Sequence, residues 1–117
     1  MPVRSLSSSV LKWPTRSEVT RAVTNWLHGL SKAGRIVHGG YFGSYARGDA
    51  GVGSDIDIVV TVTGHDLAFE RRSATFDTTH LPVPADLLVY TEEELASLAN
   101  VTSRFARVLR DETVWIV

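Results

Sequence analysis

The sequence predicts a small α/β domain (α+β in its mixed sheet), with about four strands in one mixed β-sheet and helices packed on one side. Three observations lead to this prediction. The chain has 117 residues, which is the length of a single domain. Stretches with helical spacing of apolar residues alternate with short β-branched runs. No repeat and no shift of composition marks a second domain, so we expect one layered unit.

The first helix is expected at about residues 16–31. Thr15 followed by Glu18 is a capping-box pattern, in which each side chain can satisfy a free backbone N–H at the start of a helix. Apolar residues then recur at helical spacing from Val19 to Leu30. They give the helix one apolar stripe for packing on a sheet.

The later elements are predicted from apolar runs and turn residues. A second capping-box pattern, Thr91 with Glu94, marks the start of the last helix. A β-branched run from Ile56 to Val62 has the character of a buried strand. In chain order we expect a strand at 35–42, a one-turn helix at 44–47, strands at 56–62 and 83–90 with a helix at 65–79 between them, a helix from 92 to about 109, and an edge strand at 113–117.

Composition limits the classes of function. The chain has 12 Lys and Arg against 13 Asp and Glu, so it has no excess of cations to bind a long nucleic acid. The absence of cysteine excludes disulfides and thiolate metal sites. No apolar run reaches the ~20 residues of a membrane helix, and residues 1–12 lack the apolar core of a signal peptide. We expect a cytoplasmic protein without membrane contact, with an N-terminal tail at 1–14 and the domain at 15–117.

A glycine-rich segment carries the most informative pattern. Gly43 and Ser44 directly follow the strand expected at 35–42. Glycine lets a polyanion approach the backbone, and a serine hydroxyl with neighbouring N–H groups can bind phosphate. After ten intervening residues come Asp55 and Asp57, two positions apart where the next strand is expected. Their carboxylates therefore point to the same face.

Asp86 lies in the following expected strand, between Ala85 and Leu87. If the two strands pair, Asp86 joins Asp55 and Asp57 on one surface. Three clustered carboxylates need a cation, and hard oxygen ligands select Mg²⁺ or Mn²⁺. A divalent site that faces a phosphate-binding loop is typical of phosphoryl or nucleotidyl transfer.

Each part of this pattern also has a simpler interpretation. An Asp-x-Asp pair alone is commonly a solvated strand edge, and Gly-Ser alone is commonly a turn. Gly51-Val52-Gly53 lacks the spacing of a dinucleotide-binding fingerprint. The stretch from Asp55 to Val59 lacks the oxygen ligand at position five and the glycine of a calcium loop. The combination of all parts is far more specific than any one of them.

The combined pattern resembles the signature of the DNA-polymerase-beta-like nucleotidyltransferase superfamily. The longer string from 42 to 58 is similar to that of the minimal nucleotidyltransferases (MNT proteins): Phe42-Gly43-Ser44-x-Ala46-Arg47-Gly48-x5-Ser54-Asp55-Ile56-Asp57-Ile58. The resemblance to these proteins covers about residues 16–117. The resemblance implies a polymerase-beta-like nucleotidyltransferase core. Many MNT proteins are the antitoxin of a HEPN-domain toxin, and the implied reaction is transfer of AMP from ATP to a tyrosine of that toxin.

The resemblance also implies roles for individual residues. Gly43 and Ser44 would hold the triphosphate of ATP. Asp55 and Asp57 would bind two Mg²⁺ (or Mn²⁺) ions together with that ATP. Asp86 would bind the metal ion near the acceptor and help to deprotonate the acceptor hydroxyl.

Other residues of the segment have two interpretations each. Arg47 and Ser54 match the family string and are expected among the nucleotide-binding residues. Arg47 can pair with phosphate or lock the loop through Asp49 or an active-site carboxylate. Tyr45 can flank the nucleotide or be modified itself. Further along the chain, Arg71-Arg72 is expected to be a solvated helix face that can also meet acidic groups of a partner.

Three functions are compatible with the sequence. The first is a metal-dependent nucleotidyltransferase that adds AMP to a tyrosine of a partner toxin, with ATP and a HEPN-type toxin as partners. The second is nucleotidyl transfer to a small molecule such as an aminoglycoside, for which 117 residues leave no substrate-binding domain unless a dimer supplies it. The third is a non-catalytic nucleotide-binding module that neutralises its partner by contact. A homo-oligomer is compatible with all three.

Overall fold

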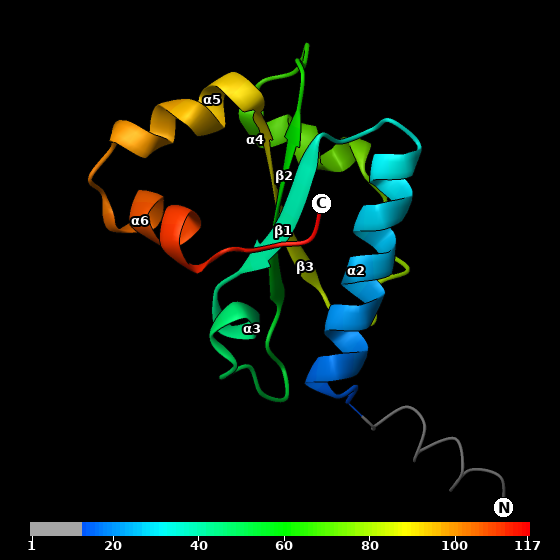
Figure 1. Ribbon diagram of the computed structural model, residues 1–117. Coiled ribbons are helices and arrows are strands. Elements are labelled where there is room, and N and C mark those ends of the chain that lie inside the picture. The colour runs from blue at the N-terminus through cyan, green and yellow to red at the C-terminus, as the bar shows by residue number, and fades with distance from the viewer. Residues whose placement is uncertain (1–12) are drawn as a thin grey trace, which may run out of the picture.

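Four strands form one mixed sheet in the computed structural model, which describes residues 13–117 (Figure 1). The strands are β1 (His38–Phe42), β2 (Ile56–Val62), β3 (Ala85–Thr91) and β4 (Val114–Trp115). Their order across the sheet is β3-β2-β1-β4. β1 runs antiparallel to β2 and to β4, whereas β2 and β3 are parallel. The predicted fold class with a mixed four-stranded sheet is therefore confirmed.

The longest helix starts and ends close to its predicted limits. The helices and 3₁₀ turns are α2 (Arg16–Lys32), α3 (Ser44–Arg47), α4 (Phe69–Arg72), η1 (Ser73–Thr75), α5 (Glu92–Ser97), η2 (Leu98–Asn100) and α6 (Arg104–Glu112). The predicted capping box of α2 is formed, because Thr15 Oγ1 accepts from the Glu18 N–H and Glu18 Oε1 accepts from the Thr15 N–H. No helix among residues 13–117 is long and apolar enough to cross a membrane.

Side chains of β2 alternate between the two faces of the sheet. Ile58 and Val60 are fully buried in the core that includes α2. Val59 points to the opposite face, where it packs with Phe42 and with Leu109 of α6. Helices thus cover both faces, with α2 on one side and α5 and α6 on the other (Figure 1). The expectation of helices on one side is wrong on this point, because β2 is apolar on both faces and each face needs cover.

Two predicted helices differ from the structure. The helix expected at 65–79 is reduced to α4 and η1, because the backbone is extended at Ala68 and again at Phe76. The helix expected from 92 to about 109 is broken at Val101, whose backbone is extended. Ser103 then starts α6 as its N-cap, since its Oγ accepts from the Ala106 N–H at 3.2 Å.

The first and last strands are shorter than predicted. The first strand begins at His38, three residues later than expected, and β4 covers only two of the five residues expected in the edge strand. The expected N-terminal tail at 1–14 lies outside the described residues, apart from Trp13 and Pro14. Trp13 packs against the main core.

Candidate active site

The register of the sheet brings two of the predicted aspartates side by side. Asp57 of β2 lies directly opposite Asp86 of β3 in the parallel pair, so both side chains project from the same face. Asp55 was expected inside the strand, but β2 begins at Ile56. The ladder to β3 starts there because the Ile56 N–H donates to the carbonyl of Pro84, and Pro84 has no N–H to extend the pairing toward Asp55.

The three carboxylates repel one another electrostatically. The pKa of Asp57 is raised, first by its partial burial and then by the negative charges of Asp86 and Asp55, while the Arg47 cation opposes the rise. None of the three aspartates makes a hydrogen bond or ion pair with another described residue. Apart from the more distant Arg47 cation, no described residue compensates their negative charge, a condition that favours a bound cation.

A divalent cation fits this set of donors. In the described part of the chain, no three His, Asp or Glu side chains converge into a complete metal site. Mg²⁺ does not need such a set, because it retains water and is usually bound by one or two carboxylates together with substrate phosphates. Oxygen-only ligands from Asp55, Asp57 and Asp86 meet this requirement when a triphosphate supplies the remaining oxygens.

The Gly43–Ser44 turn packs directly against Asp57. Gly43 has a φ of 72° and a ψ of −147°, a region that is essentially restricted to glycine. A Cβ at this position would overlap the Asp57 carboxylate and lie 3.2 Å from its Cγ. Ser44 begins α3, and its hydroxyl makes no hydrogen bond within residues 13–117. The turn thus places a hydroxyl without a hydrogen-bond partner in the described chain, and a backbone without a side chain at Gly43, beside Asp57 and Asp86. We call the end of the sheet that carries these two aspartates and Asp55 the acidic edge.

Arg47 and Ser54 stabilise the loop around this edge. Arg47 Nε lies 3.3 Å from Asp49 Oδ2, and its NH1 lies 3.5 Å from Glu112 Oε1 at the end of α6. Ser54 Oγ accepts from the Gly51 N–H at 3.0 Å. Of the two interpretations of Arg47, the observed contacts match the loop lock through Asp49. Binding of nucleotide by Arg47 and Ser54 stays a prediction.

A cleft that the sequence analysis did not identify lies next to the aspartates. It has a volume of about 220 Å³ and is lined by Asp57, Asp86 and apolar side chains. Phe105 of α6 is 45% exposed at this cleft and packs edge-to-face on Phe42, with ring centroids 6.1 Å apart. No local pattern signals this wall, because it depends on α6 folding back toward β1. The remaining lining residues are Leu87 and Leu88.

Comparison with known proteins identifies the family of the chain. The nucleotidyltransferase domain family matches residues 31–116, which include the Gly43–Ser44 turn and all three aspartates. The chain belongs to the nucleotidyltransferase domain family. The fold of this nucleotidyltransferase domain is similar to the crystal structure of a candidate nucleotidyltransferase from Sulfolobus solfataricus, with a TM-score of 0.59 and 20% identity over 86% of this chain and 80% of that one. The chain matches no curated protein at a significant level.

Two further residues of the nucleotidyltransferase domain differ from expectation. Tyr45 is only 6% exposed and packs in the main core, so its hydroxyl is not open to modification at the surface. Arg72 is buried rather than solvated. It donates to the carbonyl oxygens of Leu67 at 2.9 Å and Val89 at 3.2 Å, and it forms an ion pair with Glu94. Arg72 therefore cannot meet a partner.

Proposed function

We propose that this nucleotidyltransferase domain transfers AMP from ATP to a tyrosine hydroxyl of a HEPN-type toxin and thereby acts as its antitoxin. The observation that carries the transfer step is the packing of the Gly43–Ser44 turn against Asp57, next to Asp86. A phosphate-binding turn and uncompensated carboxylates at one edge are the two parts that nucleotidyl transfer needs. The likeness of the 42–58 segment to minimal nucleotidyltransferases supports the antitoxin role.

In the proposed transfer of AMP, each residue of the site has a defined role. The acceptor oxygen bonds to the α-phosphorus of ATP, the bond from that phosphorus to the bridging oxygen breaks, and pyrophosphate leaves. Asp86 is exposed and free of partners among the described residues, and it accepts the proton of the acceptor hydroxyl. The Ser44 hydroxyl donates a hydrogen bond to the triphosphate. Mg²⁺ or Mn²⁺ ions held by Asp55, Asp57 and Asp86 would neutralise the phosphate charge.

The walls of the cleft favour an aromatic acceptor over a small cationic sugar. Phe105, Leu87 and Leu88 present apolar surface beside Asp86. An aromatic ring can pack on such a wall while its hydroxyl reaches the carboxylate. An aminoglycoside carries many hydroxyl and ammonium groups, and an apolar wall would leave these without hydrogen-bond partners.

Mass spectrometry of the toxin tests this proposal. The full chain is incubated with ATP, Mg²⁺ and the protein encoded by the neighbouring gene, and the mass of that protein is measured. We expect the addition of AMP with the wild-type chain and none with Asp86→Asn. Asp66→Asn changes an exposed aspartate outside the site and should retain full transfer. A stable complex with a silenced toxin of unchanged mass would contradict transfer and support the non-catalytic module.

A further inference from the structure

The outer side of β3 is one of the two edges of the sheet and has no strand partner in the described chain. The Ile56 N–H of β2 donates to the Pro84 carbonyl, which fixes the direction in which the backbone groups of β3 point. Because this direction alternates along a strand, the N–H and C=O groups of Asp86 face β2. Those of its neighbours Ala85 and Leu87 face outward, away from the sheet.

A side chain covers the part of this outer edge that lies farther from the candidate site. The Arg72 guanidinium donates to the outward carbonyl of Val89 at 3.2 Å. Arg72 belongs to α4, which lies at the opposite end of the sheet from α3 (Figure 1). The outward groups of Ala85 and Leu87, by contrast, make no hydrogen bond with any described residue. We call Ala85–Leu87 the open segment of β3, and Asp86 is at its centre.

The open segment borders the cleft that was assigned to the acceptor. Asp86 and Leu87 both line that cleft, together with Phe105. Residues directly opposite each other in an antiparallel strand pair project to the same face, with Cβ atoms about 4.5–5.5 Å apart. A side chain opposite Asp86 on an added strand would therefore project onto the face that carries the aspartates, beside the cleft.

The second edge of the sheet, at β4, is too distant from Asp86 to present an acceptor hydroxyl to it. The strand order is β3-β2-β1-β4. Neighbouring strands lie about 4.8 Å apart, so a strand added beside β4 would lie about 19 Å from β3. A strand added beside β3 would lie about 5 Å from the backbone of Asp86. Of the two edges, that of β3 is the one within reach of the candidate site.

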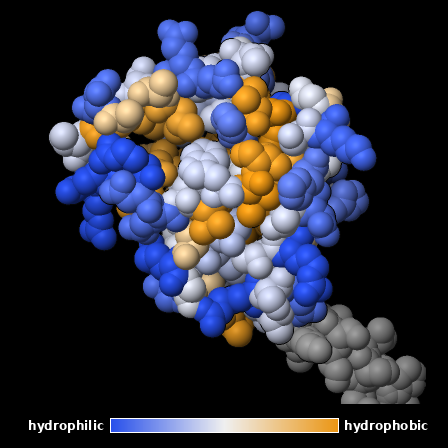
Figure 2. Space-filling view, in the orientation of Figure 1, coloured by the Kyte–Doolittle hydropathy of each residue, from blue (hydrophilic) through white to orange (hydrophobic). Residues whose placement is uncertain are grey.

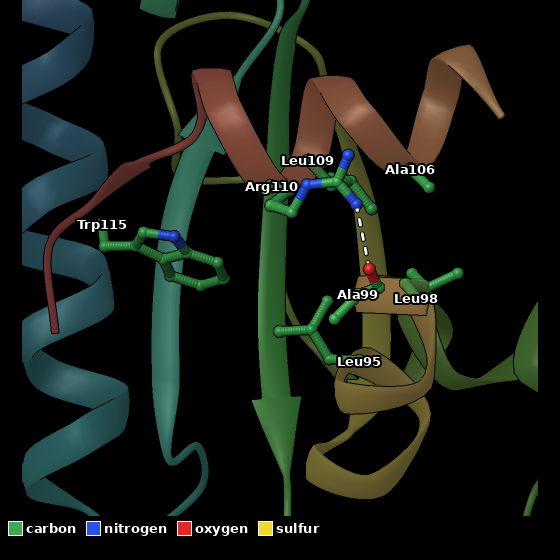
Figure 3. A pocket seen from close by; sticks show the side chains of 7 residues that line it. All are labelled: Leu95, Leu98, Ala99, Ala106, Leu109, Arg110 and Trp115. Carbon is green, nitrogen blue, oxygen red and sulfur yellow. Dashed lines mark hydrogen bonds between the residues drawn. The ribbon is translucent and has the colours of Figure 1, made fainter. Parts of the chain in front are cut away.

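An apolar groove of about 210 Å³ lies between α5, α6 and β4, on the same face of the sheet as the aspartates (Figure 3). Its charged lining residue is Arg110, whose guanidinium already donates to the Ala99 carbonyl at 3.2 Å. Figure 2 shows hydrophobic side chains at the surface near α5, beside strongly hydrophilic ones near α6. The groove offers apolar contact but no carboxylate, so it cannot activate an acceptor hydroxyl. Its other lining residues are Leu95, Leu98, Ala99, Ala106, Leu109 and Trp115.

We infer that an extended segment of the acceptor protein adds to the open segment of β3 as a further strand, with the acceptor tyrosine opposite Asp86; this rests on the proposed transfer to a tyrosine hydroxyl. Extended backbone supplies N–H and C=O groups that match the outward groups of Ala85 and Leu87. In strand addition the main-chain hydrogen bonds supply affinity, and the alternating side chains supply specificity. The edge of β3 would thus bring the tyrosine to the site without a separate substrate-binding domain.

A second copy of this chain is a poor occupant of the same edge. In a two-fold antiparallel pairing centred on the open segment, Asp86 of one copy would lie directly opposite Asp86 of the other. Like charges directly opposite each other in a strand pair are destabilising. The carboxylate therefore disfavours self-pairing of the edge and favours a neutral residue, such as tyrosine, in the opposite position.

Amide hydrogen exchange followed by NMR tests the strand addition. The full chain is measured alone and with the protein encoded by the neighbouring gene. We expect the Leu87 N–H to exchange about tenfold more slowly or less in the complex, because it gains a hydrogen bond. The N–H groups of Asp86 and Leu88 face β2 and should be protected in both states, so they are the internal control. A Leu87 N–H that is already protected in the isolated chain would overturn the inference.

A variant at the first residue of β3 tests the same contact by affinity. Ala85→Pro removes an outward donor but no hydrogen bond to β2, and proline is tolerated at the first residue of an edge strand. We expect it to weaken binding of the acceptor protein by about tenfold and to leave binding of Mg²⁺-ATP unchanged. Ala85→Val retains the N–H and should bind the acceptor protein as the wild type does. Circular dichroism verifies that both variants are folded.

The measurements distinguish strand addition from the transfer of AMP. Protection of the Leu87 N–H in a complex whose acceptor protein keeps its mass would contradict transfer and support strand addition. Addition of AMP without protection of Leu87 would support transfer and overturn strand addition. The absence of any complex would overturn both. Equal binding of the acceptor protein by Ala85→Pro and the wild type would also overturn strand addition.

Discussion

Gly43 sets how closely the Gly43–Ser44 turn approaches Asp57. Its backbone conformation is essentially restricted to glycine, and a Cβ would overlap Asp57. Gly43→Ala should lower the free energy of unfolding by about 1–3 kcal/mol and weaken binding of Mg²⁺-ATP, because the backbone or Asp57 must move. Urea unfolding and calorimetry measure the two effects. Gly51→Ala is the matched control, since a Cβ there meets nothing within 4 Å. Equal losses in both variants would refute the specific role of Gly43.

Variants of Ser44 and Ser54 distinguish a role in binding phosphate from a role in stabilising the loop. Ser44→Ala should raise the barrier to transfer by about 1–3 kcal/mol, the strength of a hydrogen bond to a charged group, and leave unfolding unchanged. Ser54→Ala removes the bond from the Gly51 N–H and should lower the free energy of unfolding by about 0.5–1.5 kcal/mol. Transfer kinetics and urea unfolding distinguish the two. An unchanged rate in Ser44→Ala would limit that turn to a structural role.

Residues whose position follows from local patterns were predictable. Asp57 and Asp86 lie side by side because β2 pairs with β3, and because side chains along each strand alternate between the two faces of the sheet. Tyr45 and Arg72 were not placed correctly, since neither burial has a local signal. Arg72 is stabilised inside the protein by Glu94, which lies 22 positions away in the chain. A partner at that separation can be identified only once the fold is known.

The predicted starts of helices are correct where a side-chain cap was recognised in the sequence. Thr15 and Thr91 form the predicted capping boxes, so the starts of α2 and α5 were predictable from four residues each. The break before α6 was missed because apolar spacing continues across it. Ser103 is a favourable N-cap and is the signal that could have revealed the break.

The ion pair of Glu94 with Arg72 joins α5 to the segment around α4. Hydrogen bonds from Arg72 and from the Thr91 N–H lower the pKa of Glu94 from 4.5 to about 2. A lowered carboxyl pKa stabilises the fold fully above pH 4.5, and this contribution is lost as the pH falls toward 2. Glu94→Gln should therefore be less stable than wild type near neutral pH, and the difference should shrink on acidification. Urea unfolding at several pH values measures it, and a difference independent of pH would contradict this assignment.

The two faces of the sheet differ: one is buried under α2, and the other carries the candidate site. The face under α2 is closed and forms the main core. The opposite face carries the aspartates, the cleft with Phe105 and the apolar groove, all bordered by α5 or α6. The sequence predicted most of the elements of both faces, but it wrongly predicted that all helices lie on one face. That arrangement depends on how the C-terminal segment folds back across β1 to pair as β4.

Calorimetric titration of the full chain with ATP in the presence of Mg²⁺ is the most direct test of the nucleotide site. We predict binding by the wild-type chain and its loss in Asp55→Asn/Asp57→Asn, because these carboxylates and the ATP phosphates share the cations. Asp66→Asn should bind as the wild type does. Unchanged binding of Mg²⁺-ATP by the double variant, with its fold verified by circular dichroism, would contradict the central claim that the acidic edge beside Gly43 is the nucleotidyltransferase site.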